Sequence, residues 1–481
     1  MEDRVLQVED LDYNSKLNDL LPVTASREGK WWYSAVHNVT AIVSAGVLGL
    51  PSAMADLTWG PGVVVLTLSW VITFFTLWQM VEMHEMVPGK RFDRYHELGQ
   101  QAFGKNLGLW IVIPQQLLVE ISVDIVYMVT GGQALRYIYI LNCNGDHHHC
   151  PLKPSSTEIK NNPYAMTSLW ILIYGSVHFL FVQIPNFNSI AGISLAAAIM
   201  SVSYSTIAWT IPIFHNEHSQ HRDIANYTLV NVTADYDLPK ASTAGHVLSA
   251  FNALGVVAFA YAGHNVVLEI QATLRSRPGK PSMIAMWRGV FLAYVIVTIC
   301  YFPVALICYW AYGNQLAADS NSNSNSNFNS NILQFEGFRG ITTAANFMVI
   351  IHILGSYQIY AMPVFDMLET VLMKKWHLAP SFKLRLITRS TYVGITMVVA
   401  TIIPFFQPLL GFFGGFAYAP TTYFLPCCIW LAVYQPKRFG ASWTINWICI
   451  ILGVLLMITA TIGGGSEIVN EWHTYKFRTF W

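Results

Sequence analysis

Long runs of apolar residues separated by short polar segments dominate the pattern of this 481-residue chain. A helix that crosses a lipid bilayer needs about 20 mostly apolar residues. Eleven segments meet that requirement: 34–55, 61–83, 107–138, 165–184, 188–214, 246–271, 289–312, 340–362, 387–407, 409–434 and 443–465. The pattern therefore predicts an all-α integral membrane protein with about 11 transmembrane helices. One transmembrane domain would occupy 34–465, with polar tails at 1–33 and 466–481.

Composition supports the membrane assignment and narrows the range of partners. Hydrophobic residues make up 54% of the chain and charged residues only 11%, whereas soluble domains carry about 25% charged residues. A soluble protein with so little charge would expose large apolar patches, so membrane lipid is the expected surrounding. The formal net charge is zero, which argues against nucleic acid as a partner. Residues 1–33 lack the apolar core of a cleavable signal peptide, so we expect a cytoplasmic tail.

Basic residues in the connecting segments predict the orientation of the chain, because cytoplasmic loops carry an excess of Lys and Arg. With the N-terminus inside, the inner segments contain 19 of the 27 Lys and Arg residues. These segments are 1–33, 84–106, 272–288, 363–389 and 435–442. The opposite orientation would place this excess outside. We therefore expect a cytoplasmic N-terminus and an extracellular C-terminus.

The predicted outer loops carry two kinds of modification site. Asn226 and Asn231 each begin an Asn-X-Thr sequon, and such sequons accept N-linked glycans on the secretory side. Whether either is occupied stays open, because sequons also occur by chance. Cys143 and Cys150 share one polar loop. The outside is oxidising, which favours a disulfide between them; two free thiols are the alternative.

Two predicted helices contain residues that disfavour a continuous helix. The first includes Ser44, Ala45, Gly46 and Gly49 before Pro51, and the sixth includes Tyr261, Ala262, Gly263, His264 and Asn265. Interruptions at corresponding positions of two halves indicate a binding site near the midplane of an inverted-repeat transporter. Freed amides would face a substrate carboxylate and freed carbonyls a substrate ammonium. Tight helix packing through glycine is the alternative.

Acidic and imidazole side chains within predicted helices are candidates for function, because they are costly in a bilayer. Glu120 and Asp124 are four residues apart and so share one helix face. Two neighbouring carboxylates in a low dielectric are difficult to ionise together, so one would carry a proton. This suits proton coupling, while lining of a hydrated vestibule is the alternative. His264 is either functional or a satisfied structural group.

Other ionisable residues are expected to be structural or superficial. His178 and His352 lack any neighbouring signal, and Glu82, Glu269 and Asp366 lie near predicted inner helix ends, where we expect them at the membrane interface. Two histidine groups, 147–149 and His215, His218 and His221, fall in predicted outer loops. They are expected to be solvated rather than to form a metal site. The chain also lacks a phosphate-binding Gly-rich loop followed by Lys-Ser/Thr. No metal, no cofactor and no catalysis are therefore expected.

Seven segments carry a resemblance to a known family: 31–51, 76–104, 184–209, 257–273, 301–306, 355–369 and 412–427. They resemble the plant lysine/histidine-type transporters of the amino acid/auxin permease family. The resemblance runs from about residue 28 to residue 476, interrupted mainly in the outer loops. It implies a leucine-transporter-type inverted repeat (5+5) plus one helix. It also implies symport of amino acids with protons at the plasma membrane, driven by the proton gradient.

Two positions depart from the family pattern. Val256 occupies a position where the family carries an aspartate, and Asp124 occupies one where it carries a small neutral residue. Asp124 is therefore a candidate to have replaced the missing acid. The missing acid leaves open an amino-acid sensor that does not transport, and an auxin-type carrier is a second alternative. Residues 41–51 resemble the lysine/histidine branch more closely than the auxin branch.

Overall fold

The computed structural model describes residues 21, 23, 27–143, 164, 166–185, 187–221, 236, 242–277, 279–317 and 339–475. Within these ranges the chain consists of helices and short connections, with two isolated β-bridges, and it forms no strand. The all-α fold predicted from the apolar runs is therefore confirmed.

The helices follow the predicted segments closely. Their order is α2 (Trp31–Ile42), η1 (Ala45–Gly49), α3 (Leu50–Leu57), α4 (Trp59–Met83), α5 (Tyr95–Phe103), α6 (Lys105–Asn142), α8 (Thr167–Phe181), η2 (Phe187–Ile190), α9 (Ala191–His221), α10 (Thr243–Ala260), η3 (His264–Val266), α11 (Val267–Ala272), α12 (Ser282–Tyr312), η4 (Gly313–Leu316), α13 (Arg339–Thr370), η5 (Val371–Lys375), α14 (Phe382–Ile402), α15 (Phe406–Phe413), η6 (Gly414–Phe424), α16 (Leu425–Tyr434) and α17 (Ala441–Thr474). Segments η1 to η4 are 3₁₀-helices, and η5 and η6 are π-helices.

Nine helical segments of the described chain are long and apolar enough to cross a membrane. The predicted spans 165–184 and 387–407 correspond to α8 and α14, which are helical but not among the nine. Helix α8 has only 15 residues. Helix α14 begins with a basic stretch that includes Lys383, Arg385 and Arg389. The count of eleven spans therefore stays a prediction.

Several helices extend beyond the predicted bounds: α9 ends at His221 rather than 214, α12 begins at Ser282 rather than 289, and α13 ends at Thr370 rather than 362. Two further differences have identifiable reasons. Helix α14 ends at Ile402 and α15 begins at Phe406, so the connection precedes the predicted break at 408. Pro404 lies in this connection and disfavours helix in the residue before it. Helix α17 continues to Thr474 rather than ending at 465. Its polar end contacts protein, because the Ser249 hydroxyl donates to Glu467 at 3.3 Å.

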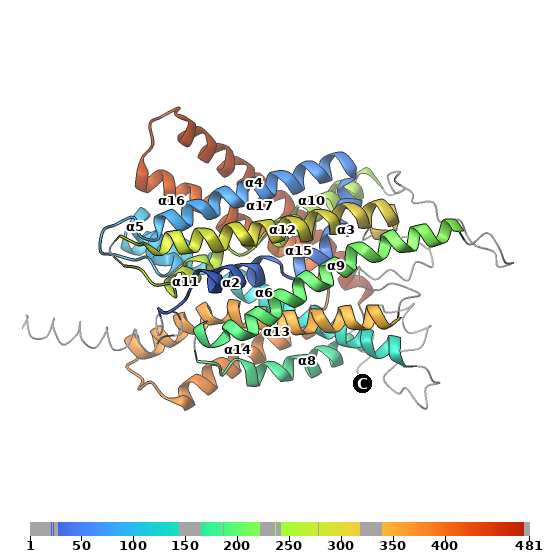
Figure 1. The fold of residues 1–481 in the computed structure, drawn as a ribbon, viewed down its shortest axis with the longest axis horizontal. Coiled ribbons are helices and arrows are strands. Elements are labelled where there is room, and N and C mark those ends of the chain that lie inside the picture. Colours follow the sequence, from blue (N-terminus) through green and yellow to red (C-terminus); the bar gives the residue numbers. More distant parts are fainter. Residues whose placement is uncertain are drawn as a thin grey trace, which may run out of the picture.

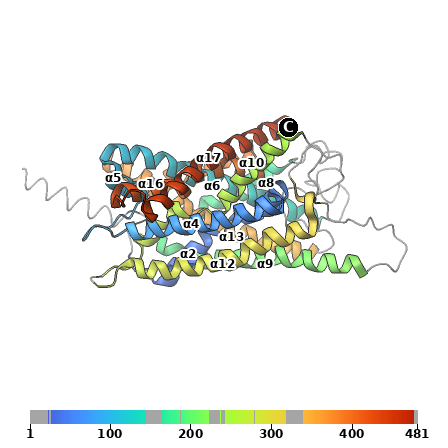
Figure 2. The ribbon, with the colours of Figure 1, turned by 90° about the horizontal axis from the view of Figure 1, so that it is seen from above.

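The long helices run lengthwise along one axis in an elongated bundle (Figures 1 and 2). The two interrupted segments lie inside it: 100% of the apolar window in α2–η1–α3 and 94% of that in α10–η3–α11 are buried. In α17, by contrast, only 22% of the apolar window is buried, so this helix presents apolar side chains outward, as a lipid-facing helix should. In both views α5 and α16 lie at one end of the bundle and the C-terminal end of α17 at the other.

Candidate functional site at two helix breaks

The structure interrupts the first and sixth spans at the predicted residues. Helix α2 ends at Ile42, and Ser44 caps the short η1, because its hydroxyl accepts a hydrogen bond from the Gly46 amide at 3.3 Å. Ala45 is the first residue of η1, and residues 44–49 are all buried. The side chain of Ser44 therefore replaces a lost helical acceptor.

The second break separates α10 from η3 and α11. Tyr261 and Ala262 follow the end of α10 outside any helix, and Gly263 has a φ of +129°. Residues with a Cβ rarely adopt this angle, which explains the glycine. Residues 261–265 are all buried. Both breaks are thus closed from solvent in this conformation.

The two breaks pack directly against each other through their glycines. A Cβ on Gly46 would lie 2.6 Å from the Ala260 Cα, and one on Gly263 would lie 2.7 Å from the Ile42 Cγ1. A Cβ on Gly49 would meet Leu410 and Val256 at 2.8 Å. Close packing is therefore part of the role of these glycines. A leucine at Gly46 would push the two helices apart. Loss of uptake in a Gly46→Leu variant would therefore not by itself show that the break binds substrate.

Side-chain hydroxyls from other helices satisfy carbonyl groups of the broken backbone. Unwound backbone survives in a membrane only where protein or water meets its polar groups. Four hydroxyl groups donate to these carbonyls: Ser356 to Thr40 (3.2 Å), Tyr360 to Ala41 (2.9 Å), Tyr204 to Ser44 (3.3 Å) and Tyr301 to Ala260 (2.6 Å). The Tyr301 hydroxyl also contacts the Ile42 carbonyl. One tyrosine of α12 thereby bridges both breaks.

Sequence reasoning missed these hydroxyls. The donors come from α9, α12 and α13, and their spacing carries no sign of the carbonyls they meet. A weak signal existed at Tyr301, which lies within an apolar run at the start of the segment 301–306. A buried tyrosine usually finds a partner for its hydroxyl. The identity of that partner required the fold.

His264 and Asn265 anchor the second break to neighbouring helices. The His264 Nε2 lies 3.0 Å from the Thr76 hydroxyl and 3.0 Å from the Thr73 carbonyl of α4. The Asn265 amide donates to the Thr421 hydroxyl of η6 at 3.3 Å. Through these contacts both side chains fix the position of η3, and a part for His264 in substrate binding stays a prediction.

The carboxylates Glu120 and Asp124 are both fully buried on α6, but they have different partners. Asp124 accepts a hydrogen bond from the Tyr392 hydroxyl of α14 at 2.7 Å. Glu120 accepts one from the Gln116 amide at 3.0 Å. The same amide nitrogen lies 2.9 Å from Glu269 of α11 and 3.3 Å from the Asn265 carbonyl. The structure thus brings Glu120 to Glu269 and the second break.

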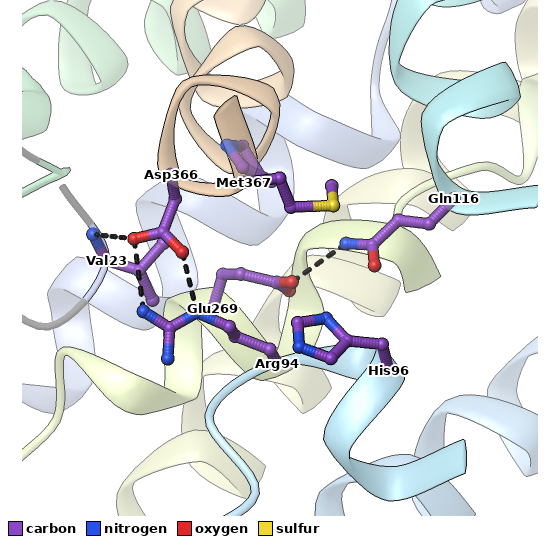
Figure 3. A pocket seen from close by; sticks show the side chains of 8 residues that line it. Val23, Arg94, His96, Gln116, Glu269, Asp366 and Met367 are labelled. Carbon is purple, nitrogen blue, oxygen red and sulfur yellow. Dashed lines mark hydrogen bonds and ion pairs between the residues drawn. The ribbon is translucent and has the colours of Figure 1, made fainter. Parts of the chain in front are cut away.

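Glu269 and Asp366 are buried, 2% and 1% exposed, so both carboxyl groups contact protein, and their depth relative to the membrane interface stays a prediction. Asp366 accepts two hydrogen bonds from Arg94, at 2.6 and 3.3 Å, and one from the Val23 amide at 3.4 Å. These partners come from segments distant in sequence, which is why position along a helix could not predict them. Figure 3 shows the pocket that these groups line together with Gln116, His96, Pro363 and Met367.

Some of the remaining predicted residues make structural contacts, and others lie outside the residues that the structure describes. His352 bonds to the Ala197 carbonyl at 3.0 Å, and the His178 ring packs on Tyr357 with centroids 4.2 Å apart. Within the described part of the chain, no group of His, Cys, Asp or Glu could hold a metal. Cys143 is disulfide-bonded. Cys150, Asn226, Asn231 and His147–His149 lie outside the described residues, so the pairing and the glycosylation stay predictions.

Comparisons with known proteins agree with this architecture. The family described as transmembrane amino acid transporter protein matches residues 27–464. The chain is 52% identical to Lysine histidine transporter-like 1 of Arabidopsis thaliana, over 98% of this chain and 95% of the relative. It is 54% identical to Lysine histidine transporter-like 3 of the same plant, over 95% and 93%.

A solved structure shares the fold at low sequence similarity. It is a Na⁺-coupled sialic acid symporter in a substrate-bound, outward-open state, with a TM-score of 0.50 and 10% identity. The match covers 93% of this chain and 92% of the symporter. This likeness concerns the helical transporter fold alone. The family match over residues 27–464 and the relatives at 52% and 54% identity establish that this chain belongs to the transmembrane amino acid transporter family.

Proposed function

We propose that this chain carries amino acids into the cell across the plasma membrane together with protons. The observation that carries the proposal is the pair of buried helix breaks that contact each other at Gly46 and Ala260. Both breaks leave backbone groups outside regular helices, and every amino acid carries a carboxylate and an ammonium that such groups can bind. Substrate entry requires the breaks to move apart, because residues 44–49 and 261–265 are buried.

The names of the relatives suggest which side chains the site accepts. Lysine histidine transporter-like proteins match nearly the whole chain at 52% and 54% identity. We therefore include lysine and histidine among the substrates. Recognition of the common carboxylate and ammonium by backbone groups would also admit neutral amino acids, because these groups do not depend on the side chain.

Buried acids near the breaks support proton coupling. Glu120 and Asp124 are 0% exposed, and neither forms an ion pair with a described basic residue. An unpaired charge at this depth is costly, so intramembrane acids commonly mark proton pathways. A carboxyl group that takes up a proton on one side and releases it on the other would couple amino-acid movement to the gradient.

Uptake into proteoliposomes containing the purified full-length chain tests the proposal. Labelled lysine, histidine and alanine are supplied with and without an inward proton gradient, and labelled auxin is supplied in parallel. We expect gradient-dependent accumulation of amino acids. Binding without accumulation would indicate the sensor alternative, and accumulation of auxin alone would indicate an auxin-type carrier.

A further inference from the structure

We infer that the transported proton is held by Glu120 and Glu269 together, through the amide of Gln116, rather than by Glu120 and Asp124. This assignment rests on the proposed proton coupling and specifies its site. One amide nitrogen lies 3.0 Å from the Glu120 Oε1 and 2.9 Å from the Glu269 Oε1. The two carboxyl groups, from α6 and α11, are therefore close neighbours.

Three buried oxygen atoms of this site lack a donor. Gln116, Glu120 and Glu269 are 1%, 0% and 2% exposed. The second carboxyl oxygen of each glutamate and the amide oxygen of Gln116 have no hydrogen-bond partner among the described residues. A buried polar atom without a partner is unfavourable. A proton bound to one of the two carboxyl groups would supply a hydrogen-bond donor to these oxygen atoms. The geometry of the site therefore favours one protonated carboxyl group.

Surrounding charges do not neutralise the pair. The nearby titratable and charged groups are Asp124, Arg94, His96, Asp366 and the hydroxyls of Tyr95, Tyr360, Tyr392 and Tyr418. Arg94, the cation among them, is bonded to Asp366 at 2.6 Å and to Glu97 at 3.2 Å. Asp124 is bonded to Tyr392. Two buried carboxylates without a cationic partner would hold one proton between them.

The pair is connected to the substrate region and to one end of the bundle. The Gln116 amide that bonds to both glutamates also lies 3.3 Å from the Asn265 carbonyl at the second break. On the other side, Glu269 and Gln116 line the pocket with Arg94, His96 and Asp366 (Figure 3). Arg94 directly precedes α5, and α5 lies at the end of the bundle that is predicted to be cytoplasmic. A change in the protonation of either glutamate would thus alter the hydrogen bonds of Gln116, including its contact with the second break. The proton would leave toward the cytoplasmic end through this pocket.

Isosteric variants in proteoliposomes test the assignment. One pH unit of gradient supports about tenfold accumulation when one proton accompanies each substrate. For Glu120→Gln and Glu269→Gln we expect the concentration of labelled lysine inside the vesicles to rise no higher than the concentration outside. Substrate-induced proton uptake should disappear in both variants. Exchange of labelled for unlabelled lysine without a gradient should persist, because exchange requires no net proton movement. Glu82→Gln, at the inner end of α4, is the matched control and should accumulate lysine normally.

Three other outcomes would overturn the assignment, and a fourth would reject the proposed function. The assignment is overturned if the glutamate variants keep gradient-driven accumulation, or if Asp124→Asn loses it while Glu269→Gln does not. It is also overturned if the glutamate variants lose exchange together with accumulation, since that marks a structural role. Accumulation driven by a Na⁺ gradient and not by protons in the unmodified protein would reject the proposed function itself, which separates the two failures.

Discussion

At the scale of single residues, the hydroxyl of Tyr301 joins the two breaks by contacting carbonyl groups of both. It lies 2.6 Å from the Ala260 carbonyl and also contacts the Ile42 carbonyl. Tyr301 is fully buried, so water cannot readily replace its hydroxyl. A buried acceptor that loses its donor costs about 1–3 kcal/mol. One oxygen atom thus contributes to holding the closed arrangement.

Replacement of Tyr301 by phenylalanine should destabilise the protein by about 1–3 kcal/mol and weaken transport, because the buried Ala260 carbonyl loses its hydroxyl donor. Thermal unfolding in detergent and lysine uptake measure the two effects. Tyr309→Phe is the matched control on the same helix, since the Tyr309 hydroxyl has no hydrogen-bond partner among the described residues. Equal stability of the two variants would contradict the bridging role.

His96, outside the spans on α5, gives a pH-dependent contribution to stability. Burial and the neighbouring Arg94 charge lower the pKa of His96 from 6.5 to about 4. As pH falls, the unfolded chain therefore binds a proton at His96 before the folded chain does, and the contribution of His96 to stability decreases between pH 6.5 and about 4.

The variant His96→Gln should show a smaller loss of thermal stability over that pH interval than the unmodified protein, because it lacks this titrating group. His377→Gln is the control, since His377 is exposed and its surroundings change little on unfolding. Melting temperatures across a pH series provide the measurement. Parallel pH profiles for His96→Gln and the unmodified protein would refute the prediction.

At the scale of elements, a loop holds the short helix α11 at its C-terminal end. The Arg91 guanidinium donates to the carbonyls of Gln271 (3.0 Å), Ala272 (3.2 Å) and Leu274 (3.2 Å). A helix end leaves such carbonyls without intrahelical partners, and a cation there is favourable. Because α11 also carries Glu269, the loop fixes the position of one proposed proton-binding group.

Removal of this cap by Arg91→Gln should increase amide hydrogen exchange in residues 267–274, because three carbonyls lose their common donor. Lys90→Gln is the matched control, since Lys90 is exposed and donates to Gln101 instead. Hydrogen-exchange mass spectrometry of both variants measures the difference. Unchanged protection of this peptide in Arg91→Gln would show that packing alone holds α11.

At the scale of the whole molecule, the distribution of basic segments follows the long axis of the bundle. Helix α5 is part of the basic segment 84–106, and α16 directly precedes the basic segment 435–442. Both helices lie at the end of the bundle opposite the C-terminal end of α17 (Figures 1 and 2). The Gly29 amide bonds to the Thr273 carbonyl at 2.9 Å, which brings the N-terminal segment to a third basic segment, 272–288. This gathering favours a cytoplasmic N-terminus, because basic loops stay inside.

An epitope tag placed at the N-terminus should therefore be protected from antibody in intact cells, and one placed at the C-terminus should be accessible. Permeabilised cells are the control, in which both tags should be labelled. Surface labelling with the two tagged forms makes the measurement. Accessibility of the N-terminal tag alone would reverse the predicted orientation.

The sequence by itself determined the membrane class, the positions of the helices and the two breaks. These depend on local properties: a run of apolar residues long enough for a bilayer, and Gly or Pro residues that disfavour helix. The buried acids Glu120 and Asp124 were visible for the same reason, because any charge inside an apolar run stands out. Their separation by four residues correctly placed both on one helix, where both are buried.

Only the tertiary structure decided which groups these residues meet. Glu120 lies near Glu269, 149 residues later in the chain, through a bond from Gln116, and Asp124 meets Tyr392 instead. The hydroxyl of Tyr301 finds two carbonyls that lie on two other segments. Helical periodicity relates residues on one helix face, whereas contacts between helices depend on how the whole bundle packs. The partners of a buried polar group are therefore a property of the fold.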